Sequence, residues 1–396
     1  MFNTLKQIAA VTRFSFASLP QRLGSSASAM LGIAGVVAVM VGVLSIAQGI
    51  MSTMTSSAGM GNVMVLRSGA DTEMTSGFGG EDARLITEAP GLKQGPDGPL
   101  ASRELFVIIN LPMRSTGTDA NVPLRGVEAA AAEVRQDFEI VEGRMFEPGL
   151  AEVVVGLGAQ MEFSGLDVGS TIKVGTAQWP VVGVFSAGGG ISESEIWSDA
   201  RVLQDGFRRG NSYQSVHATL DSPDRFNEFK DALTSDSRLN VQVMTEAEYY
   251  SEQSQVLYNL ITVLGSLIAV IMGLGAIFGA LNTMYTAVSA RTREIATLRA
   301  LGFRSGPVIV SVLAESLLLA LVGGIIGAGL AWLAFDGFRA ATLNFASFSA
   351  ITFAFDVNLG LLTLGIVFAL VIGFIGGFFP AVRAARTPVA LALREQ

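Results

Sequence analysis

The sequence of 396 residues contains no cysteine and only one histidine, His217. The absence of cysteine excludes disulfide bonds and thiolate metal sites. A single histidine excludes zinc sites that need a histidine pair, including the HExxH motif. His217 stands in the alternating segment SVHATL, which is typical of a strand. We therefore expect a hydrogen-bonded or surface strand residue, with a lone catalytic base as the alternative.

Lysine is also scarce, which bears on nucleotide binding. A P-loop requires the motif GxxxxGK[ST], in which backbone amides and the lysine hold the phosphates. The four lysines, none of which follows a glycine, are Lys6, Lys93, Lys173 and Lys230. The chain therefore contains no P-loop, and we expect ATP and magnesium to be bound by another polypeptide.

Hydrolytic patterns are missing as well. No GxSxG elbow occurs and no histidine follows residue 217, so the sequence offers no recognisable nucleophile and base. The acidic pair Glu193 and Glu195 in GGGISESEIW is expected to lie in a solvated loop, and a cation site is the alternative. We predict a non-catalytic chain that holds no cofactor and no metal of its own.

Charged residues make up only 15% of the chain and hydrophobic residues 50%, whereas soluble domains carry about 25% charged residues. Much of the chain must therefore face something other than water. The charges that are present concentrate in residues 51–255, which hold 15 basic and 29 acidic side chains. This acidic balance argues against nucleic acid as a partner, because nucleic-acid binding needs basic patches.

Four apolar runs are long enough to cross a lipid bilayer, for which about 20 residues suffice. The predicted spans are residues 25–50, 256–283, 307–335 and 359–380. The apolar run over residues 30–50 is longer than the roughly 7–15 residues of a cleavable signal peptide, so we expect a retained span. The predicted fold is a membrane protein with four transmembrane α-helices and a large extracytoplasmic α+β domain, residues 51–255, inserted between helices 1 and 2.

The short segments beside the spans indicate their orientation. Residues 1–24, 284–306 and 381–396 are basic, and short basic segments stay in the cytoplasm. We therefore expect both termini in the cytoplasm of a cell with the chain in its inner membrane, and residues 51–255 and the 336–358 loop outside. Residues 1–24 interleave apolar and basic positions, as in an amphipathic helix on the inner leaflet.

The region 51–255 alternates between strand-like and helix-like patterns separated by glycine and proline turns. Strands are predicted at 63–66, 105–111, 122–127, 152–155, 171–174, 181–185, 215–220 and 241–244, and helices at 81–88, 128–138 and 224–235. The pattern indicates small sheets covered by helices on one face, in one core or in two lobes divided near Leu157. Thr245 followed by Glu248 is typical of a helix start, and this helix should continue as a stalk into the second span.

Polar residues are rare within the spans. Glu315 is the only ionisable residue there, and we expect it to pair with an arginine of the central segment or to hydrogen-bond between helices; a proton relay is the alternative. Asn282 is expected to be a similar polar tie. Each of the last three spans has two glycines four residues apart, which permit close helix packing. These pairs are Gly275 and Gly279, Gly323 and Gly327, and Gly373 and Gly377.

The central segment, residues 281–302, reads LNTMYTAVSARTREIATLRALG and carries a dense group of charges between two apolar runs. A short helix with exposed charges and a few apolar side chains can dock into a soluble partner. The expected contact residues are Arg291, Arg293, Glu294, Ile295, Leu298, Arg299, Leu301 and Gly302. Ile295 and Leu298 share one helix face and are the expected apolar contacts; their insertion into lipid is the alternative.

Three membrane segments and four outer segments carry a family resemblance. The membrane segments are NTMYTAVSARTREIATLRALGF, VLAESLLLALVGGIIGAGLAW and FPAVRAARTPVALALR. The outer segments are LRGV, EGRMFEPG, VGSTIKVG and WPVVGVF. In this order, and over nearly the whole chain, they resemble the MacB/FtsX/LolC family of ABC transporter permeases, the mechanotransmission class.

The resemblance implies a complex and a mechanism. Two permeases, either two copies of this chain or this chain and a related permease, would assemble with two copies of a separate ABC ATPase. Residues 291–302 would be the coupling helix that seats in the ATPase, so that ATP hydrolysis moves the periplasmic domains. The implied function is export or efflux, with a periplasmic adaptor in MacB-like members, or lipoprotein release in LolC-like members. The alternative is an FtsX-like regulator that activates an extracytoplasmic cell-wall hydrolase.

Overall fold

The computed structural model describes residues 7–8, 11–13, 23–56, 58–59, 61–135, 137–174, 177–344 and 349–389 of the chain. It divides into two compact units. Unit 1 comprises residues 1–48, 259–338 and 355–396, and unit 2 comprises residues 49–258 and 339–354. Most of the predicted amphipathic helix over residues 1–24, and the end of the predicted tail over residues 381–396, lie outside the described residues.

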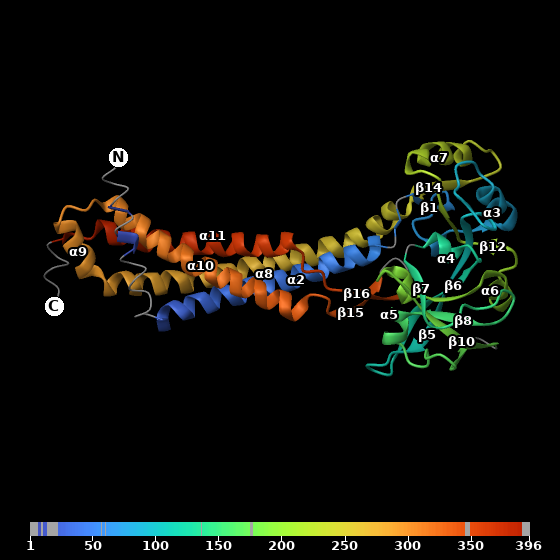
Figure 1. Cartoon of the computed structure of the whole chain (residues 1–396), viewed down its shortest axis with the longest axis horizontal. Coiled ribbons are helices and arrows are strands. Elements are labelled where there is room, and N and C mark those ends of the chain that lie inside the picture. The colour runs from blue at the N-terminus through green and yellow to red at the C-terminus, as the bar shows by residue number, and fades with distance from the viewer. Residues whose placement is uncertain are drawn as a thin grey trace. The chain divides into compact units, whose positions relative to one another are not determined.

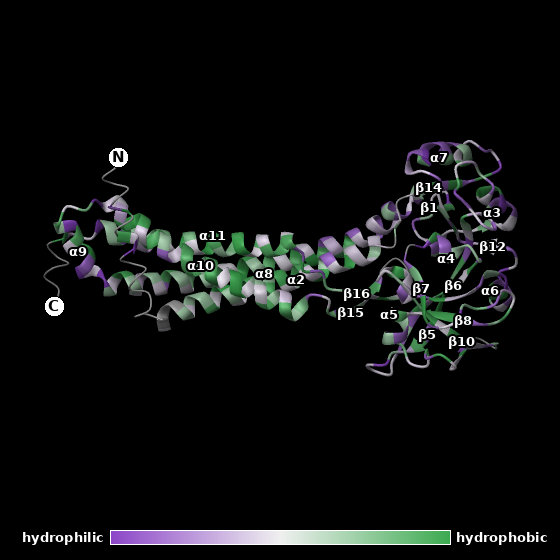
Figure 2. Cartoon of the chain, in the orientation of Figure 1, coloured by the Kyte–Doolittle hydropathy of each residue, from purple (hydrophilic) through white to green (hydrophobic). Residues whose placement is uncertain are grey.

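Unit 1 is built from long apolar helices (Figure 1). Four helices are long and apolar enough to cross a membrane: α2 (Leu23–Ser56), α8 (Glu246–Ala290), α10 (Ser305–Phe335) and α11 (Leu359–Arg386). Figure 2 shows hydrophobic residues along all four. The prediction of four transmembrane helices is confirmed. Both α2 and α8 extend past the predicted spans, and the boundary between the units falls within each of them.

Glycines allow α10 to approach its neighbours closely. A Cβ atom on Gly323 would lie 2.8 Å from a carbonyl oxygen of α2, and one on Gly377 would lie 2.5 Å from a side-chain carbon of α10. The glycines at these contacts are Gly323 and Gly327 toward α2, and Gly373 and Gly377 toward α10. The predicted pair on α8, Gly275 and Gly279, has nothing within 4 Å in the described part of the chain. A packing role for that pair stays a prediction.

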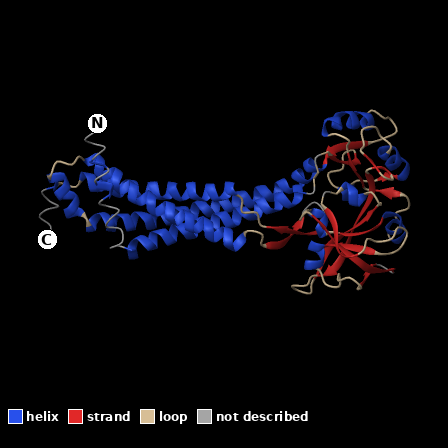
Figure 3. Cartoon of the chain, viewed as in Figure 1, coloured by secondary structure: helices blue, strands red, loops and turns tan. Residues whose placement is uncertain are grey.

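Unit 2 contains a ten-stranded sheet with the order β14-β1-β13-β5-β6-β11-β8-β10-β7, and β9 pairs with β10 (Figure 3). Its strands are β1 (Asn62–Arg67), β5 (Ala101–Pro112), β6 (Asp119–Val127), β7 (Phe138–Gly143), β8 (Val153–Gly156), β9 (Thr171–Val174), β10 (Ala177–Ala187), β11 (Ile196–Asp199), β13 (Ser215–Thr219) and β14 (Val241–Thr245). The pairs β8–β10 and β6–β11 are parallel, and the others are antiparallel. All eight predicted strands are present, but they join one extended sheet rather than several small ones.

The other elements of unit 2 are short. They are the strands β2 (Phe78–Gly79), β3 (Gln94–Gly95), β4 (Gly98–Pro99) and β12 (Ser212–Tyr213), the 3₁₀ turns η2 (Glu73–Thr75), η3 (Ile191–Ser194) and η4 (Pro223–Arg225), and the helices α3 (Gly80–Thr87), α4 (Ala131–Val134), α5 (Leu157–Glu162), α6 (Ala200–Gly206) and α7 (Phe226–Thr234). The predicted helix over residues 128–138 is wrong for most of its length, because α4 ends at Val134 and Phe138 begins β7. The ring of Phe138 stacks on Phe185 and Trp197, at centroid distances of 5.2 and 5.3 Å. This long-range packing favours a strand there.

Two of the hydrophobic clusters in unit 2 lie along different parts of the same sheet. One includes Leu105 and Trp179, and the other includes Val216 and Phe229. Strand β5 joins the two parts, since its first residues pair with β13 and its later residues with β6. The predicted division near Leu157 does not separate the clusters, because β8 before that residue pairs with β10 after it.

Residues 336–358, predicted as an outer loop, contain a hairpin of β15 (Arg339–Asn344) and β16 (Ser349–Ala354). The backbone N–H of Thr352 donates to Ser194 Oγ at 3.0 Å. Ile351 and Phe353 on the same strand are buried. The prediction of an outer loop did not include this hairpin, although the segment SAITFA has the β-branched and aromatic side chains that suit a packed strand.

Candidate functional site

The central segment forms the helix α9 (Thr292–Ala300), which is separated from α8 only by Arg291. Its end is defined by a Schellman motif. The N–H of Phe303 donates to the carbonyl of Leu298 at 3.2 Å, and the N–H of Gly302 donates to the carbonyl of Arg299 at 3.1 Å. Gly302 adopts a φ of +96°, which a side chain would strain. Glycine at this position therefore fixes where α9 stops and how Leu301 is presented.

The two faces of α9 differ from the expected assignment. Ile295 packs against the hydrophobic cluster formed by α8, α10 and α11, and Leu298 is half-buried and lines the same hollow as Ile295. Arg293 and Glu294 are exposed, and Leu301 is 74% exposed. The apolar side chain presented to the surroundings is therefore Leu301 rather than Ile295. The reason is that the apolar face of α9 packs against α8, α10 and α11.

Arg299 ties α9 to the end of α11. Its Nη1 donates to the carbonyl of Thr387 at 2.7 Å, and the side chain is half-buried. Arg299 therefore positions α9 within unit 1, although the sequence suggested a surface contact.

Arg291 and Glu315 form a buried ion pair. Arg291 Nη1 lies 2.9 Å from Glu315 Oε2, and their side chains are 7% and 5% exposed. This pairing is the first of the alternatives predicted for Glu315. Arg291 is thereby removed from the exposed surface on which we expected it. Asn282 is exposed and its side chain makes no hydrogen bond to another described residue, so the expected polar tie is not found there.

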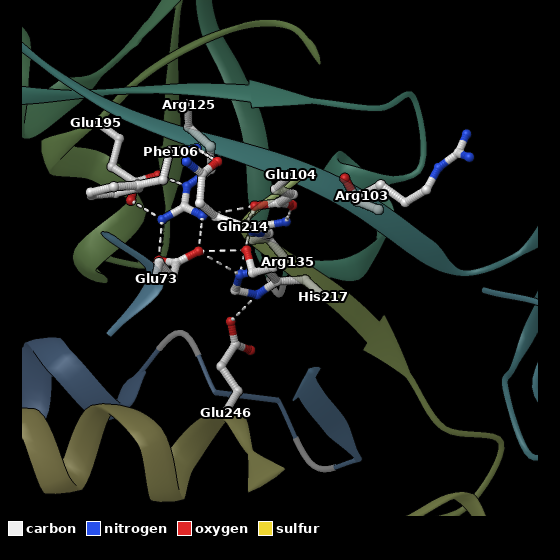
Figure 4. Close-up of polar contacts among 12 residues, drawn as sticks. Glu73, Arg103, Glu104, Phe106, Arg125, Arg135, Glu195, Gln214, His217 and Glu246 are labelled. Carbon is white, nitrogen blue, oxygen red and sulfur yellow. Dashed lines mark hydrogen bonds and ion pairs between the residues drawn. The ribbon is translucent and has the colours of Figure 1, made fainter. Parts of the chain in front are cut away.

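Unit 2 contains a buried ionic cluster that the sequence pattern does not predict (Figure 4). Arg125 on β6 is 1% exposed and contacts three carboxylates, those of Glu73 at 2.6 Å, Glu195 at 2.7 Å and Glu104 at 2.9 Å. Arg135 pairs with Glu104 as well. The only sequence signal was a charge inside otherwise apolar strands, RELFVIINL and VPLRGV.

His217 links this ionic cluster to the first turn of α8. Its Nδ1 lies 3.3 Å from Glu246 Oε1, and its Nε2 lies 3.4 Å from Glu73 Oε1. Asn62 Nδ2 also donates to Glu246, at 3.0 Å, and the backbone N–H of Glu73 donates to Tyr249 Oη at 3.1 Å. His217 is thus a buried, hydrogen-bonded strand residue, as predicted. These contacts attach the start of α8 to the sheet.

The expectation of a solvated loop for Glu193 and Glu195 was wrong, because both side chains are buried. Glu193 Oε1 accepts hydrogen bonds from the backbone N–H groups of Ala187 and Gly189, each at 2.8 Å. Glu195 accepts from Arg125 and from the indole of Trp197. These donors already satisfy the two carboxylates, which argues against a cation site there.

Glu73, Glu104 and His217 could geometrically hold a metal ion, since their ligand atoms lie within 4.8 Å of one another. The guanidinium of Arg125, however, contacts both carboxylates. A divalent cation would have to displace or face that positive charge. We therefore interpret the group as part of the ionic cluster.

Burial and charge act in opposite directions on this cluster. Burial alone would raise the pKa of Glu104, but the charges of Arg135, His217 and Arg125 lower it to about 2. Burial likewise opposes protonation of His217, but the carboxylate of Glu104 and the hydrogen bonds to Glu246 and Glu73 outweigh burial and the repulsion by Arg135, and raise the pKa of His217 to about 9. The histidine is therefore cationic at neutral pH and completes the cluster.

The free energy of unfolding of unit 2 is expected to fall as pH rises from about 6.5 through about 9, by up to about 3 kcal/mol. The folded protein retains a proton on His217 that the unfolded chain, with a pKa near 6.5, releases. Stability should also fall as pH falls from about 4.5 to about 2, because in this range the unfolded chain binds a proton on Glu104 that the folded protein does not bind. Urea unfolding of the full chain, followed by tryptophan fluorescence at several pH values, measures both slopes. In the His217→Gln variant the alkaline slope should flatten, and an unchanged slope would contradict the role of His217.

The chain matches two family models. Residues 26–236 match the MacB-like periplasmic core domain, and residues 266–389 match the FtsX-like permease C-terminal. It is 28% identical over 280 residues to the pyoverdine export ATP-binding/permease protein PvdT of Pseudomonas entomophila, covering 66% of this chain and 41% of that protein. It is 26% identical over 420 residues to the macrolide export ATP-binding/permease protein MacB of Azoarcus sp., covering 100% of this chain and 60% of that protein.

A further relative is the uncharacterized ABC transporter permease YknZ of Bacillus subtilis, 32% identical over 155 residues, with 39% of this chain and 36% of that protein covered. The chain spans about half the length of the relatives it matches, between 36% and 60% for these three. Among solved structures, the extracellular domain of YknZ is similar with a TM-score of 0.36 and 19% identity, covering 46% of this chain and 99% of that one. The periplasmic region of MacB from Actinobacillus actinomycetemcomitans has a TM-score of 0.37 and 13% identity, covering 50% and 94%.

Proposed function

The chain belongs to the family of ABC transporter permeases with a MacB-like periplasmic core domain, and from this premise we propose that it converts ATP hydrolysis by a partner into motion of unit 2, its extracytoplasmic domain. The partner is a separate ABC ATPase in two copies, which binds ATP and magnesium. Two permeases complete the complex, either as a homodimer or with a related permease. Both termini and α9 face the cytoplasm.

The positions of the lysines indicate that ATP is bound outside these 396 residues. The relatives PvdT and MacB are named ATP-binding/permease proteins, but none of the four lysines in these 396 residues stands in a P-loop. ATP must therefore be bound outside these residues, since phosphate binding of that kind needs the glycine-rich loop and its lysine. This supports a permease that is driven by a partner.

The observation that carries the proposal is the exposed face of α9. Arg293 and Glu294 offer charges that can orient a partner, and Leu301 offers an apolar side chain that is 74% exposed. Interfaces of this kind concentrate their binding energy in a few side chains that enter pockets of the partner. The partner groove should accept Leu301 and pair with the charges beside it.

Transmission away from α9 would use α8. This helix runs without a break from Glu246 to Ala290, and α9 begins two residues later. At its other end, Glu246 attaches the first turn to strands β13 and β1 of unit 2, and Tyr249 attaches it to the turn η2. A displacement of α9 would therefore act on a helix that is anchored in the extracytoplasmic domain.

The relatives named for pyoverdine and macrolide export favour export as the outcome of this motion. The alternative is an FtsX-like regulator of a cell-wall hydrolase. Unit 2, with residues 49–258 and 339–354, is larger than we expect for that role. Copurification from membranes tests the two: a periplasmic adaptor supports export, and a peptidoglycan hydrolase supports regulation.

Leu301→Asp is expected to lower the stimulation of the partner ATPase at least about tenfold, because a charge would replace the apolar contact in the partner groove. The position is exposed, so the variant should insert and fold normally. ATP turnover of the reconstituted complex, measured with and without the permease, gives the result. Leu298→Asp should have a similar effect but also disturb the packing of α9, because Leu298 is half-buried.

Leu150→Asp is the matched control, since Leu150 is 46% exposed and lies in unit 2. It should leave ATP turnover unchanged. Equal turnover in the Leu301→Asp complex and the wild-type complex would reject α9 as the contact with the ATPase.

A further inference from the structure

Unit 2 contains a cavity of about 500 Å³ that the proposed function does not use. Its walls come from the end of α2, the loop after β1, the strand β14, the first turns of α8 and the hairpin β15–β16. All of the described residues that line it belong to unit 2. A volume of this size lies within the range of about 300–1,000 Å³ that is usual for small-molecule sites.

The apolar part of the lining lies where two predicted spans end. Ile50 is the last residue of the predicted span 25–50, and Val256 is the first of the predicted span 256–283; both line the cavity, together with Leu343 of the hairpin. Amphiphilic molecules accumulate at such a boundary between hydrocarbon and water. A ligand that lies in the outer leaflet would therefore meet this cavity with its apolar part.

The charged side chains of the lining are acidic. Asp71 and Glu252 line the cavity, and none of the other described lining residues is a lysine or an arginine. Both carboxylates are exposed, and neither forms an ion pair with another described residue. A cationic group in the cavity would gain attraction from both, whereas an anionic group would be repelled.

We infer that this cavity is a binding site for small amphiphilic cations, which place their apolar part against Ile50, Val256 and Leu343 and their positive charge near Asp71 and Glu252. The inference goes beyond the proposed function, because binding at this site requires neither ATP nor a partner ATPase. It also brings the ligand to the first turns of α8, since Tyr249 lines the cavity and accepts a hydrogen bond from the backbone of Glu73 in the ionic cluster.

The experiment uses the full chain in lipid nanodiscs without ATPase, and rhodamine 6G as the amphiphilic cation. Saturable binding above that of empty nanodiscs is expected from fluorescence anisotropy. The Asp71→Asn/Glu252→Gln variant should bind about tenfold more weakly, since two partly screened attractions are lost. Leu343→Lys should abolish binding, because it places a like charge inside the cavity at a position that is 54% exposed and thus tolerant of substitution. The anionic amphiphile 1-anilinonaphthalene-8-sulfonate should not bind at the same concentrations.

Leu150→Lys is the control, since it adds the same charge to unit 2 at an exposed leucine outside the cavity, and it should leave the affinity unchanged. Equal affinities of the wild type and both cavity variants would overturn the inference. Absence of dye binding by the wild type would also overturn the inference. If Leu343→Lys then altered the oligomeric state, the cavity would be assigned to contact with a second copy of the chain. Neither outcome depends on ATP turnover, so a failure here is distinct from a failure of the proposed function.

Discussion

Arg125→Met is expected to remove most of the stability of unit 2. The substitution leaves the carboxylates of Glu73, Glu104 and Glu195 without the guanidinium that contacts all three. Removing one partner of a buried ion pair costs about 3–5 kcal/mol, and a folded domain is stable by only about 5–15 kcal/mol in total. We expect the loss to reach or exceed the upper end of that cost, because one cation serves three anions.

The measurement is thermal and urea unfolding of the full chain in detergent, followed by tryptophan fluorescence. Trp179 and Trp197 are buried in unit 2 and report on its unfolding. Arg125→Lys should be intermediate, since lysine keeps the charge but not the planar fork that reaches several carboxylates.

The matched control is Arg114→Met. Arg114 also pairs with a carboxylate of unit 2, that of Asp167 at 2.7 Å, but the two side chains are 40% and 65% exposed. Surface pairs contribute at most about 1 kcal/mol, so this variant should unfold close to the wild type. If Arg125→Met and Arg114→Met shifted the transition equally, the ionic cluster would not stabilise unit 2.

Glu315→Leu is expected to have the second large effect, destabilising unit 1 by about 3–5 kcal/mol. The substitution removes the carboxylate that Arg291 contacts at 2.9 Å, among helices that bury both side chains. A cation in such surroundings is strongly disfavoured without its partner. Thermal stability and the yield of monodisperse protein in detergent should both fall.

The double variant Arg291→Met/Glu315→Leu should recover much of this stability, because replacing both partners of a buried pair by apolar side chains is often neutral. It then tests whether the pair also fixes the position of α9, which begins directly after Arg291. We expect reduced ATPase stimulation in a protein that folds. Arg293→Met, at an exposed position on the same segment, should leave stability unchanged. A single Glu315→Leu variant as stable as the wild type would contradict the importance of the pair.

Features that depend on neighbouring residues in the chain could be predicted from the sequence. The four spans follow from long apolar runs, because a helix in lipid must satisfy its own backbone groups and present apolar side chains throughout. The strands of unit 2 follow from alternating patterns. The end of α9 at Ala300 agrees with the nearby Gly302, since glycine tolerates the positive φ found there. The start of α8 could also be predicted from nearby residues, since Thr245 Oγ1 accepts a hydrogen bond from the N–H of Glu248 at 3.1 Å.

The contacts of the ionic cluster could not be predicted from neighbouring residues in the chain. Arg125 lies 52 residues from Glu73 and 70 from Glu195 in the chain. The pairing of β6 with β11 brings Arg125 to Glu195, and Glu73 reaches Arg125 from the turn η2, where Ser215 of β13 also donates to it. For the same reason the sequence around Glu195 was interpreted as a polar loop, although its side chain is buried. A charged side chain carries no local signal of whether water or an opposite charge will surround it.

The sequence by itself thus determined the membrane helices, the strands and the absence of a P-loop, because each depends on the order of nearby residues. Only the tertiary structure decided which residues of α9 face outward, that Arg291 pairs with Glu315, and that residues 339–354 form a hairpin within unit 2. These outcomes depend on contacts between elements far apart in the chain. Their free energies come from burial and charge pairing that exist only after the elements have assembled.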